Sequence, residues 1–231
     1  MNNKIIIATI KKWNILETKK FILQNPEKNI YLITDKKDLT LKKVKEINPR
    51  YIFFPHWSWK IPKKITENYE CIAFHMTDLP FGRGGSPLQN LIIRGFKETK
   101  ISAIKADKEI DSGPVYLKRD LSLEGTANEI FKRTAKIIFN EMIPYIIKNE
   151  PQPIIQKGKI VMFKRRKPEE SNIAKLDEIN KVYDYIRMLD VEGYPSAFIE
   201  TDTLKIKFSN AKLKEDFITA KAKIKLRDLY K

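Results

Sequence analysis

The sequence predicts an α/β protein with a Rossmann-like, mostly parallel sheet and a small C-terminal α+β appendage. Short apolar runs alternate with amphipathic stretches through the first half of the chain, a pattern typical of strands joined by crossover helices. With 231 residues, 42% of them hydrophobic, the chain is long enough for one sizeable domain plus a small addition. A charged stretch at 163–178 marks a boundary. We therefore expect a core over residues 1–165, and a linker with a small subdomain of one helix and a β-hairpin over 166–231.

Individual elements follow from the same patterns. Four apolar runs predict strands at 4–9, 29–34, 51–54 and 71–74, with helices expected at 13–24 and 39–47. Further along, we expect a strand at 101–106, a turn into another strand over 110–123, and a long helix at 126–149, where apolar residues recur with helical spacing. In the appendage we expect a helix at 179–189, two alternating runs that form a hairpin, and a polar, basic tail.

Composition and motifs exclude several classes of protein. The single cysteine, Cys71, cannot form an intramolecular disulfide, and no Cys and His residues have zinc-ligand spacing, so we expect no metal and a cytoplasmic location. The first apolar run is too short for a signal peptide or for a membrane span of about 20 residues. Because GxGxxG and P-loop motifs are absent, the predicted sheet does not imply NAD or a nucleoside triphosphate as a ligand.

The formal charge of +16 raises the question of an anionic partner. Lys supplies 36 of the 45 basic residues, whereas phosphate and base recognition tends to favour Arg. The lysines are also spread along the whole chain. These two observations favour a solvated, lysine-rich surface over a nucleic-acid interface.

Both histidines of the chain follow predicted strands. His56 comes after the strand at 51–54, in company with Trp57 and Trp59, and His75 follows the strand at 71–74. Ligands of open α/β sheets bind beyond the carboxyl ends of the strands. The two histidines therefore predict a functional site on this rim.

A loop rich in Gly and Pro follows His75, over 74–87. Gly82, Gly84 and Gly85 leave backbone N–H groups uncovered, and Arg83 can bind an anionic group through two hydrogen bonds. A plain surface loop would have similar glycine content. The loop becomes informative only together with a second motif further along the chain.

The two motifs together resemble those of the folate-dependent formyltransferases. Their signature is Asn-x-His-x-Ser-Leu-Leu-Pro, followed by an Arg-Gly loop and a helix that begins with Pro. Residues that match it here are His75, Thr77, Leu79, Pro80, Arg83, Gly84 and Pro87. The segment 103–116 is similar to the second motif of the family, a loop ending in Asp-x-Gly, which places Asp111 and Gly113. The resemblance covers most of the chain and is weakest over 10–50.

This resemblance implies a formyltransferase core and a reaction in which 10-formyl-tetrahydrofolate gives its formyl group to an amine, without a metal. His75 would stabilise the oxyanion and transfer a proton. Asp111 would orient His75, favour its protonated form and accept the proton that the amine loses. Implied folate-binding residues are Trp57, Ser58, Trp59, Lys60, Leu79, Pro80, Lys105, Ala106 and Asp107. Implied substrate-binding residues are Thr77, Arg83, Gly84 and Gly85.

One position departs from the family pattern. Ala73 stands where the family has the Asn that is thought to hold the formyl oxygen, an interaction of a kind that can contribute about 3–4 kcal/mol. His56 and Asn90 are the candidates to replace it. We expect His56 to do so, because it shares the predicted rim and is then a third catalytic residue.

The appendage decides which amine is expected. It is too short for the RNA-binding barrel of methionyl-tRNA formyltransferases, and GYPSAF at 193–198 looks like a segment of the sugar-modifying enzymes. We therefore expect a nucleotide-linked amino deoxysugar destined for a surface glycan such as an O-antigen, a homodimer formed through the appendage, and no nucleic-acid or membrane partner. Two alternatives stay open: an enzyme acting on methionyl-tRNA, and an inactive relative that binds folate or a nucleotide sugar.

Overall fold

The computed structural model describes residues 3–227, which form two compact units. The first unit consists of residues 3–84, 99–121 and 131–162, and the second of residues 85–98, 122–130 and 163–227. The division after residue 165 that the sequence suggested stays a prediction. No helix within the described range is long and apolar enough to cross a membrane.

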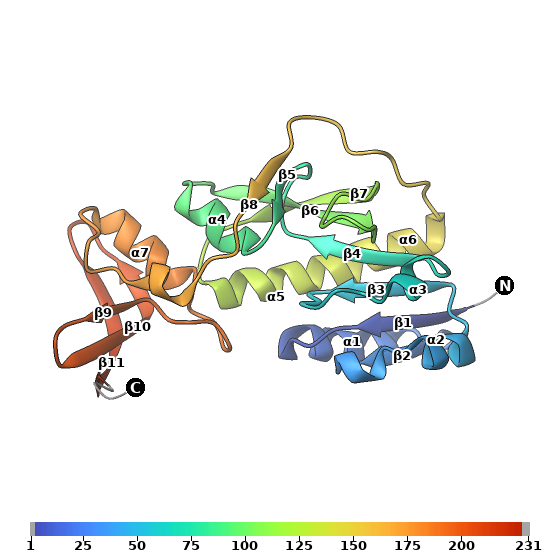
Figure 1. Cartoon of the computed structure of the whole chain (residues 1–231), viewed down its shortest axis with the longest axis horizontal. Coiled ribbons are helices and arrows are strands. Elements are labelled where there is room, and N and C mark those ends of the chain that lie inside the picture. Colours follow the sequence, from blue (N-terminus) through green and yellow to red (C-terminus); the bar gives the residue numbers. More distant parts are fainter. Residues whose placement is uncertain (1–2, 228–231) are drawn as a thin grey trace. The chain divides into compact units, whose positions relative to one another are not determined.

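A six-stranded sheet with the order β2-β1-β3-β4-β6-β7 forms the centre of the first unit (Figure 1). The strands β1, β2, β3 and β4 pair in parallel, and β6 pairs antiparallel to β4. The expected mostly parallel α/β sheet is thus confirmed. The strands are β1 (Lys4–Ala8), β2 (Asn29–Ile33), β3 (Tyr51–Pro55), β4 (Cys71–His75), β6 (Glu98–Lys105) and β7 (Val115–Ser122).

The helices of the sheet region lie close to the predicted ranges. They are α1 (Lys12–Gln24), α2 (Leu41–Ile47) and the short α3 (Lys63–Thr66), with a 3-10 turn, η1, at Lys36–Asp38. The stretch expected as one helix at 126–149 contains α5 (Ala127–Ile137), a π-helical segment η2 (Ile138–Met142) and α6 (Ile143–Asn149). Pro144, near the start of α6, has no backbone N–H to donate to the preceding turn, which accounts for the local change of helical pitch.

Alternation along the strands places one set of side chains on one face of the sheet. A buried cluster there combines Ile6, Ala8, Ile52 and Phe54 with residues of α2 and α3, and Ala73 packs against it. Helix α1 and the 127–149 helix contribute nothing to this cluster. They contact each other instead, through the rings of Trp13 and Phe131 at 5.3 Å and of Phe21 and Phe139 at 6.1 Å.

The second unit joins helices to a three-stranded antiparallel sheet with the order β11-β10-β9. Buried Arg187 ties it together, because its Nη1 donates to the carbonyls of Leu123 and Gly125 while its Nε donates to Asp184 Oδ1 at 2.6 Å. The elements are α4 (Pro87–Ile93), the 3-10 turn η3 (Pro168–Ser171), α7 (Ile179–Arg187), β9 (Phe198–Glu200), β10 (Leu204–Leu213) and β11 (Ile218–Leu226). A short ribbon pairs β5 (Phe81–Gly84) with β8 (Val161–Phe163).

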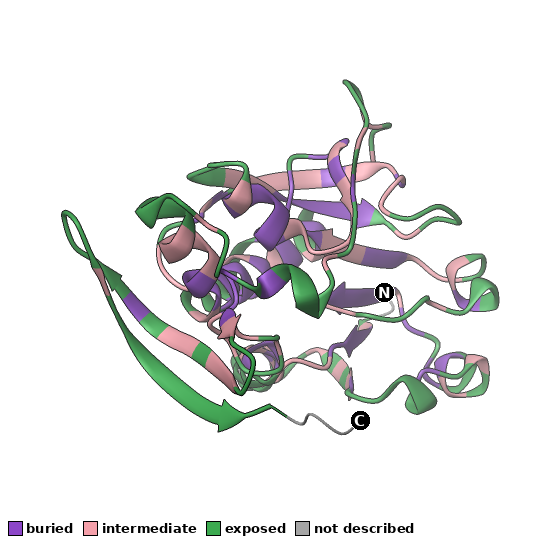
Figure 2. Cartoon of the chain, turned by 60° about the vertical axis from the view of Figure 1, so that its left-hand side comes forward, coloured by how far each residue is buried: buried purple, intermediate pink, exposed green. Residues whose placement is uncertain are grey.

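The predicted hairpin is extended by a strand that the sequence analysis took for a basic tail. Strand β11 covers the tail as far as Leu226 and pairs with β10 over its whole length. Its lysines alternate with apolar residues, so the period of two was present but was hidden by the high charge. Figure 2 shows this strand as almost entirely exposed.

We predict that Gly113→Ala destabilises the protein far more than Gly95→Ala. A Cβ at Gly113 would lie 1.8 Å from the Lys105 carbonyl oxygen, so the backbone must move, at a cost of about 3 kcal/mol. Gly95 has φ +79 but no atom within 4 Å of its added Cβ, so only a backbone strain of about 1 kcal/mol applies. Thermal unfolding should show a decrease in Tm of about 6–12 °C against about 2–4 °C. Equal decreases would contradict the close approach.

Candidate active site at the end of strand β4

The candidate site is built around the His75 ring, at the carboxyl end of β4. The ring is buried, and its Nε2 lies 2.8 Å from the carbonyl oxygen of Gly82 in β5. Because a carbonyl can only accept a hydrogen bond, Nε2 carries the proton. The other ring nitrogen, Nδ1, lies 3.4 Å from Asp111 Oδ2. The structure thus brings together the two residues that the paired motifs predicted.

Asp111 reaches His75 through an unusual backbone conformation. Its φ is +53, in the left-handed region that side chains other than Gly rarely adopt. The same carboxylate oxygen that faces His75 accepts the N–H of Gly84 at 2.9 Å. The loop after β6 and strand β5 therefore converge on one carboxylate, which fixes the orientation of the imidazole.

Gln156 completes this arrangement, and the sequence analysis did not identify it. Its Nε2 donates to the carbonyls of Asp111 and Gly113, each at 2.8 Å. Its Oε1 accepts two hydrogen bonds from Arg83, at 3.1 and 2.8 Å. A single amide thus connects the Asp111 loop to the Arg-Gly loop. The surrounding segment is anchored by two hydrogen bonds of 2.8 Å between Ile154 and Val115.

The residues expected to bind substrate have different surroundings. Thr77 is fully buried, and its hydroxyl donates to the Gly82 carbonyl at 3.4 Å, so it supports the loop from behind. Arg83 is held by Gln156, and Gly84 donates to Asp111. Gly85 belongs to the second unit, where its N–H donates to Phe163. Their role in binding stays a prediction.

Part of the expected folate-binding set gathers on the face of the sheet that carries Ala73. Trp57 and Ala106 pack against the same buried cluster as Ala73, and Trp59 lies edge-on to Trp57 with ring centroids 5.1 Å apart. The indole Nε1 of Trp57 is buried and has no hydrogen-bond partner among the described residues. Of the rest, Leu79 and Pro80 are buried and joined by a cis peptide bond, whereas Ser58, Lys60, Lys105 and Asp107 are exposed.

His56 follows Pro55, whose partner across the β3–β4 pairing is Phe74, so the two histidines do follow neighbouring strand ends. The chain turns sharply there, with φ +56 at His56, and the ring packs against Trp13 and Phe131 at 5.6 and 5.1 Å. Neither ring belongs to the cluster against which Ala73 packs. The His56 ring thus packs against rings outside the cluster that Ala73 contacts, and its expected catalytic role stays a prediction.

The other candidate, Asn90, lies in the second unit. Its Nδ2 donates to the carbonyls of Gly85, Ser86 and Lys164, each at 3.0 Å. Its Oδ1 accepts from Arg94. The amide is fully used in holding α4 to the segment after β8.

Comparison with known proteins shows the family of this chain. Residues 168–225 match a family model described as the methionyl-tRNA formyltransferase C-terminal domain. A solved methionyl-tRNA formyltransferase from Clostridium thermocellum is 57% identical, with a TM-score of 0.95 over 97% of this chain and 99% of that one. The chain belongs to the methionyl-tRNA formyltransferase family. The curated methionyl-tRNA formyltransferase of Thermodesulfovibrio yellowstonii is 27% identical over 74% of this chain, which spans 58% of that relative's length.

Family membership corrects the expected substrate. A solved sugar N-formyltransferase from Shewanella sp. is 14% identical with a TM-score of 0.66, over 86% of this chain and 93% of that one, which shows the shared fold alone. The expected likeness to the sugar enzymes is therefore wrong, and so are the nucleotide-sugar substrate, the link to surface glycans and the exclusion of nucleic acid. The error came from the length of the appendage and from GYPSAF, both of which were taken to indicate a sugar enzyme. The appendage itself matches a methionyl-tRNA formyltransferase domain. The expected homodimer stays a prediction.

We predict that Gln156→Ala lowers the free energy of unfolding by about 1–3 kcal/mol, because it leaves two partly buried carbonyls and the Arg83 guanidinium without their partner. Gln152→Ala, four residues earlier on an exposed side chain, is the matched control and should change it by less than about 0.5 kcal/mol. Denaturant unfolding measures both. Equal stabilities of the two variants would show that the bridge contributes nothing.

We also predict a loss of stability on the acid side that depends on His56. Burial, with a smaller contribution from the Lys11 charge, lowers the pKa of His56 to about 3, whereas the unfolded residue titrates near 6.5. The unfolded state therefore binds more protons, and the stability present above pH 6.5 is lost as the pH falls toward 3. Between pH 7.5 and pH 5 this amounts to about 2 kcal/mol. The free energy of unfolding is measured at both pH values. Its decrease from pH 7.5 to pH 5 should be about 2 kcal/mol smaller in His56→Gln than in His75→Gln, which keeps His56.

Proposed function

We propose that this protein transfers a formyl group from 10-formyl-tetrahydrofolate to the amino group of methionyl-tRNA. The proposal is carried by the pairing of buried His75, at the end of β4, with the partly buried Asp111, in a chain of the methionyl-tRNA formyltransferase family. The relatives' name supplies the acceptor, and the resemblance of the two motifs supplies the folate donor. The chain spans only part of the curated relatives, so both are proposals for this protein.

The reaction needs a neutral amine to attack the formyl carbon, a donor for the oxygen that becomes negative, and a proton for the departing folate nitrogen. The Nε2–H of His75 is the donor in this site. It now points at the Gly82 carbonyl, so a formyl oxygen would take the place of that carbonyl as acceptor. Donors of this kind contribute about 10²- to 10³-fold to the rate.

Asp111 sets the direction of proton movement. One carboxylate oxygen faces His75 Nδ1 and the Gly84 N–H, and it stabilises positive charge on the ring when charge develops. The attacking amine loses one proton and the folate nitrogen gains one, so the pair transfers a proton without net consumption. Nothing in this scheme requires a residue at position 73.

The cluster that includes Trp57 supports the folate donor. An indole N–H that is buried without a partner costs about 1–3 kcal/mol, and a bound ligand with an acceptor atom would remove that cost. Trp59, at 39% exposure, offers an aromatic surface beside it. A flat ring system with acceptor atoms, such as a pterin, fits both features.

We predict that His75→Ala and Asp111→Asn each reduce kcat/KM for the formylation of methionyl-tRNA by about a hundredfold or more, since single acid–base groups contribute about 10²- to 10⁴-fold. Asp120→Asn is the control and should retain activity, because that exposed carboxylate pairs, among the residues the structure describes, with Lys100 at 3.1 Å. The assay quantifies formylmethionine released from the tRNA. Activity close to wild type in either site variant would remove that residue from the mechanism.

A further inference from the structure

Gln156 lies in a segment whose path is fixed by main-chain contacts of its own. Ile154 exchanges two hydrogen bonds of 2.8 Å with Val115 at the start of β7, and the N–H of Val161 donates to the Pro80 carbonyl at 3.3 Å. Neither contact involves the Gln156 side chain. The amide of Gln156 therefore matters for what it holds on other segments.

The loop that carries Asp111 is held by this amide. Nε2 of Gln156 donates to the carbonyls of Asp111 and Gly113, each at 2.8 Å. The direction of a carbonyl follows the ψ angle of its residue, so the bond to Asp111 fixes the backbone of the residue that bears the carboxylate. Asp111 has φ +53, a conformation that persists in a residue with a Cβ only where the surroundings hold it.

Arg83 in β5 sets the direction of the amide. Its Nε and Nη2 both donate to Gln156 Oε1, at 3.1 and 2.8 Å, which turns the amide donors toward the Asp111 loop. The neighbours of Arg83 on either side in β5 contact His75 and Asp111. A closed ring of contacts thus joins both residues of the catalytic pair to Gln156 and Arg83.

We propose that Gln156 is a positioning residue for formyl transfer. Its amide holds the main chain of Asp111 so that the carboxylate faces His75, and Arg83 keeps the amide in that orientation. The inference rests on the proposed function, which makes His75 and Asp111 the acid–base pair. Gln156 acts through Asp111 and needs no contact with either substrate. Arg83 then has a different task from the anion binding that the sequence suggested.

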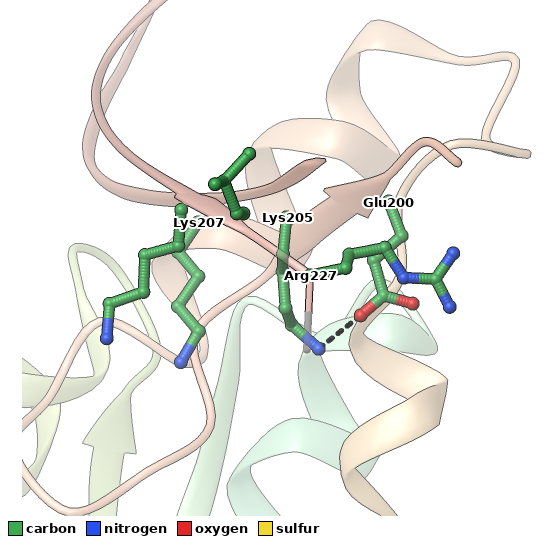
Figure 3. A pocket seen from close by; sticks show the side chains of 6 residues that line it. Glu200, Lys205, Lys207 and Arg227 are labelled. Atoms are coloured by element: carbon green, nitrogen blue, oxygen red, sulfur yellow. Dashed lines mark hydrogen bonds and ion pairs between the residues drawn. The ribbon is translucent and has the colours of Figure 1, made fainter. Parts of the chain in front are cut away.

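A polar contact in the second unit provides the contrast. Glu200 and Lys205 face each other across β9 and β10 and form an ion pair at 2.5 Å, in a shallow pocket of about 400 Å³ (Figure 3). This pair joins two strands of a sheet that carries neither His75 nor Asp111. Loss of a purely structural contact should resemble Glu200→Gln, whereas loss of a positioning contact should change the chemical step.

The kinetic test compares Gln156→Met with Gln152→Met, on an exposed side chain four residues earlier. Formylation of methionyl-tRNA by the full chain is measured with each substrate varied in turn. Gln156→Met should lower kcat about tenfold to a hundredfold and change each KM by less than about twofold, because a displaced catalytic group slows the reaction without weakening binding. Gln152→Met and Glu200→Gln should retain the wild-type kcat. A raised KM at unchanged kcat in Gln156→Met would overturn the proposal in favour of substrate binding.

Double variants test whether Gln156 acts through Asp111. Adding Gln156→Met to Asp111→Asn should slow formylation no further, since the carboxylate that Gln156 positions is already absent. Adding Arg83→Met to Gln156→Met should likewise leave kcat unchanged. Effects that multiply in the first pair would overturn the role of Gln156, and effects that multiply in the second would overturn that of Arg83.

Gln156→Glu separates the two ends of the amide. The carboxylate keeps an acceptor for Arg83 and has no donor for the carbonyls of Asp111 and Gly113. This variant should therefore be at least as slow as Gln156→Met, although its pairing with Arg83 is charge-assisted. A wild-type kcat would show that donation to the loop is not required and would contradict the proposal.

The imidazole signals in NMR spectra supply a readout that does not depend on activity. The chain has two histidines, so His56→Gln assigns both ring signals. Gln156→Met should shift the His75 signal and leave the His56 signal in place, and Gln152→Met should shift neither. An unmoved His75 signal would overturn the proposal. If wild type does not formylate methionyl-tRNA and Gln156→Met still shifts that signal, the proposed function fails while the positioning of the pair stands.

Arg83→Met keeps the test decisive if Gln156→Met does not fold. It leaves the Gln156 amide present and removes the partner of its oxygen. The His75 signal should again shift and kcat should fall with both KM values unchanged. Wild-type kcat together with an unmoved signal would refute the ring of contacts as a positioning device.

Discussion

Backbone passes directly against backbone where Gly113 crosses the Lys105 carbonyl, and the candidate site depends on that contact. No side chain fits at Gly113, so the loop after β6 closes tightly and Asp111 takes its left-handed conformation two residues earlier. Its carboxylate is thereby directed to His75 and to the Gly84 N–H. Gln156 holds the carbonyls of the same loop from a distant part of the chain. The geometry of the imidazole is thus set by packing of main chain.

Much of this site could be predicted, because short local sequence patterns indicate its two central residues. His75 ends a recognisable strand and Asp111 precedes a Gly that the turn requires, so pattern and motif both indicate them. Gln156 could not be found in this way: it lies 45 residues after Asp111, in a stretch without periodicity, and acts only through tertiary contacts. The ring contacts of His56 were equally hidden, since the positive φ that turns it toward Trp13 leaves no mark in an apolar run.

The fold could be predicted in outline and not in its C-terminal detail. Parallel strands rich in Ile and Phe are visible without a structure, because burial on both faces requires continuous apolar runs. Strand β11 has a lysine at every second position from Lys221 to Lys225, so its charge concealed its regularity. The wrong substrate had a different origin, in the short appendage and the GYPSAF segment.

The exposed outer edge of β11 has a consequence for self-association of the protein. Unpaired edge strands can pair with strands of other chains, and lysine side chains on edge strands commonly oppose this pairing. An identical hairpin added to this edge would bring two rows of ammonium groups to within about 4.8 Å, the spacing of neighbouring strands. Self-association through β11 is thereby opposed at low salt. The protection is electrostatic, so it weakens as ionic strength rises and Debye screening shortens the reach of each charge.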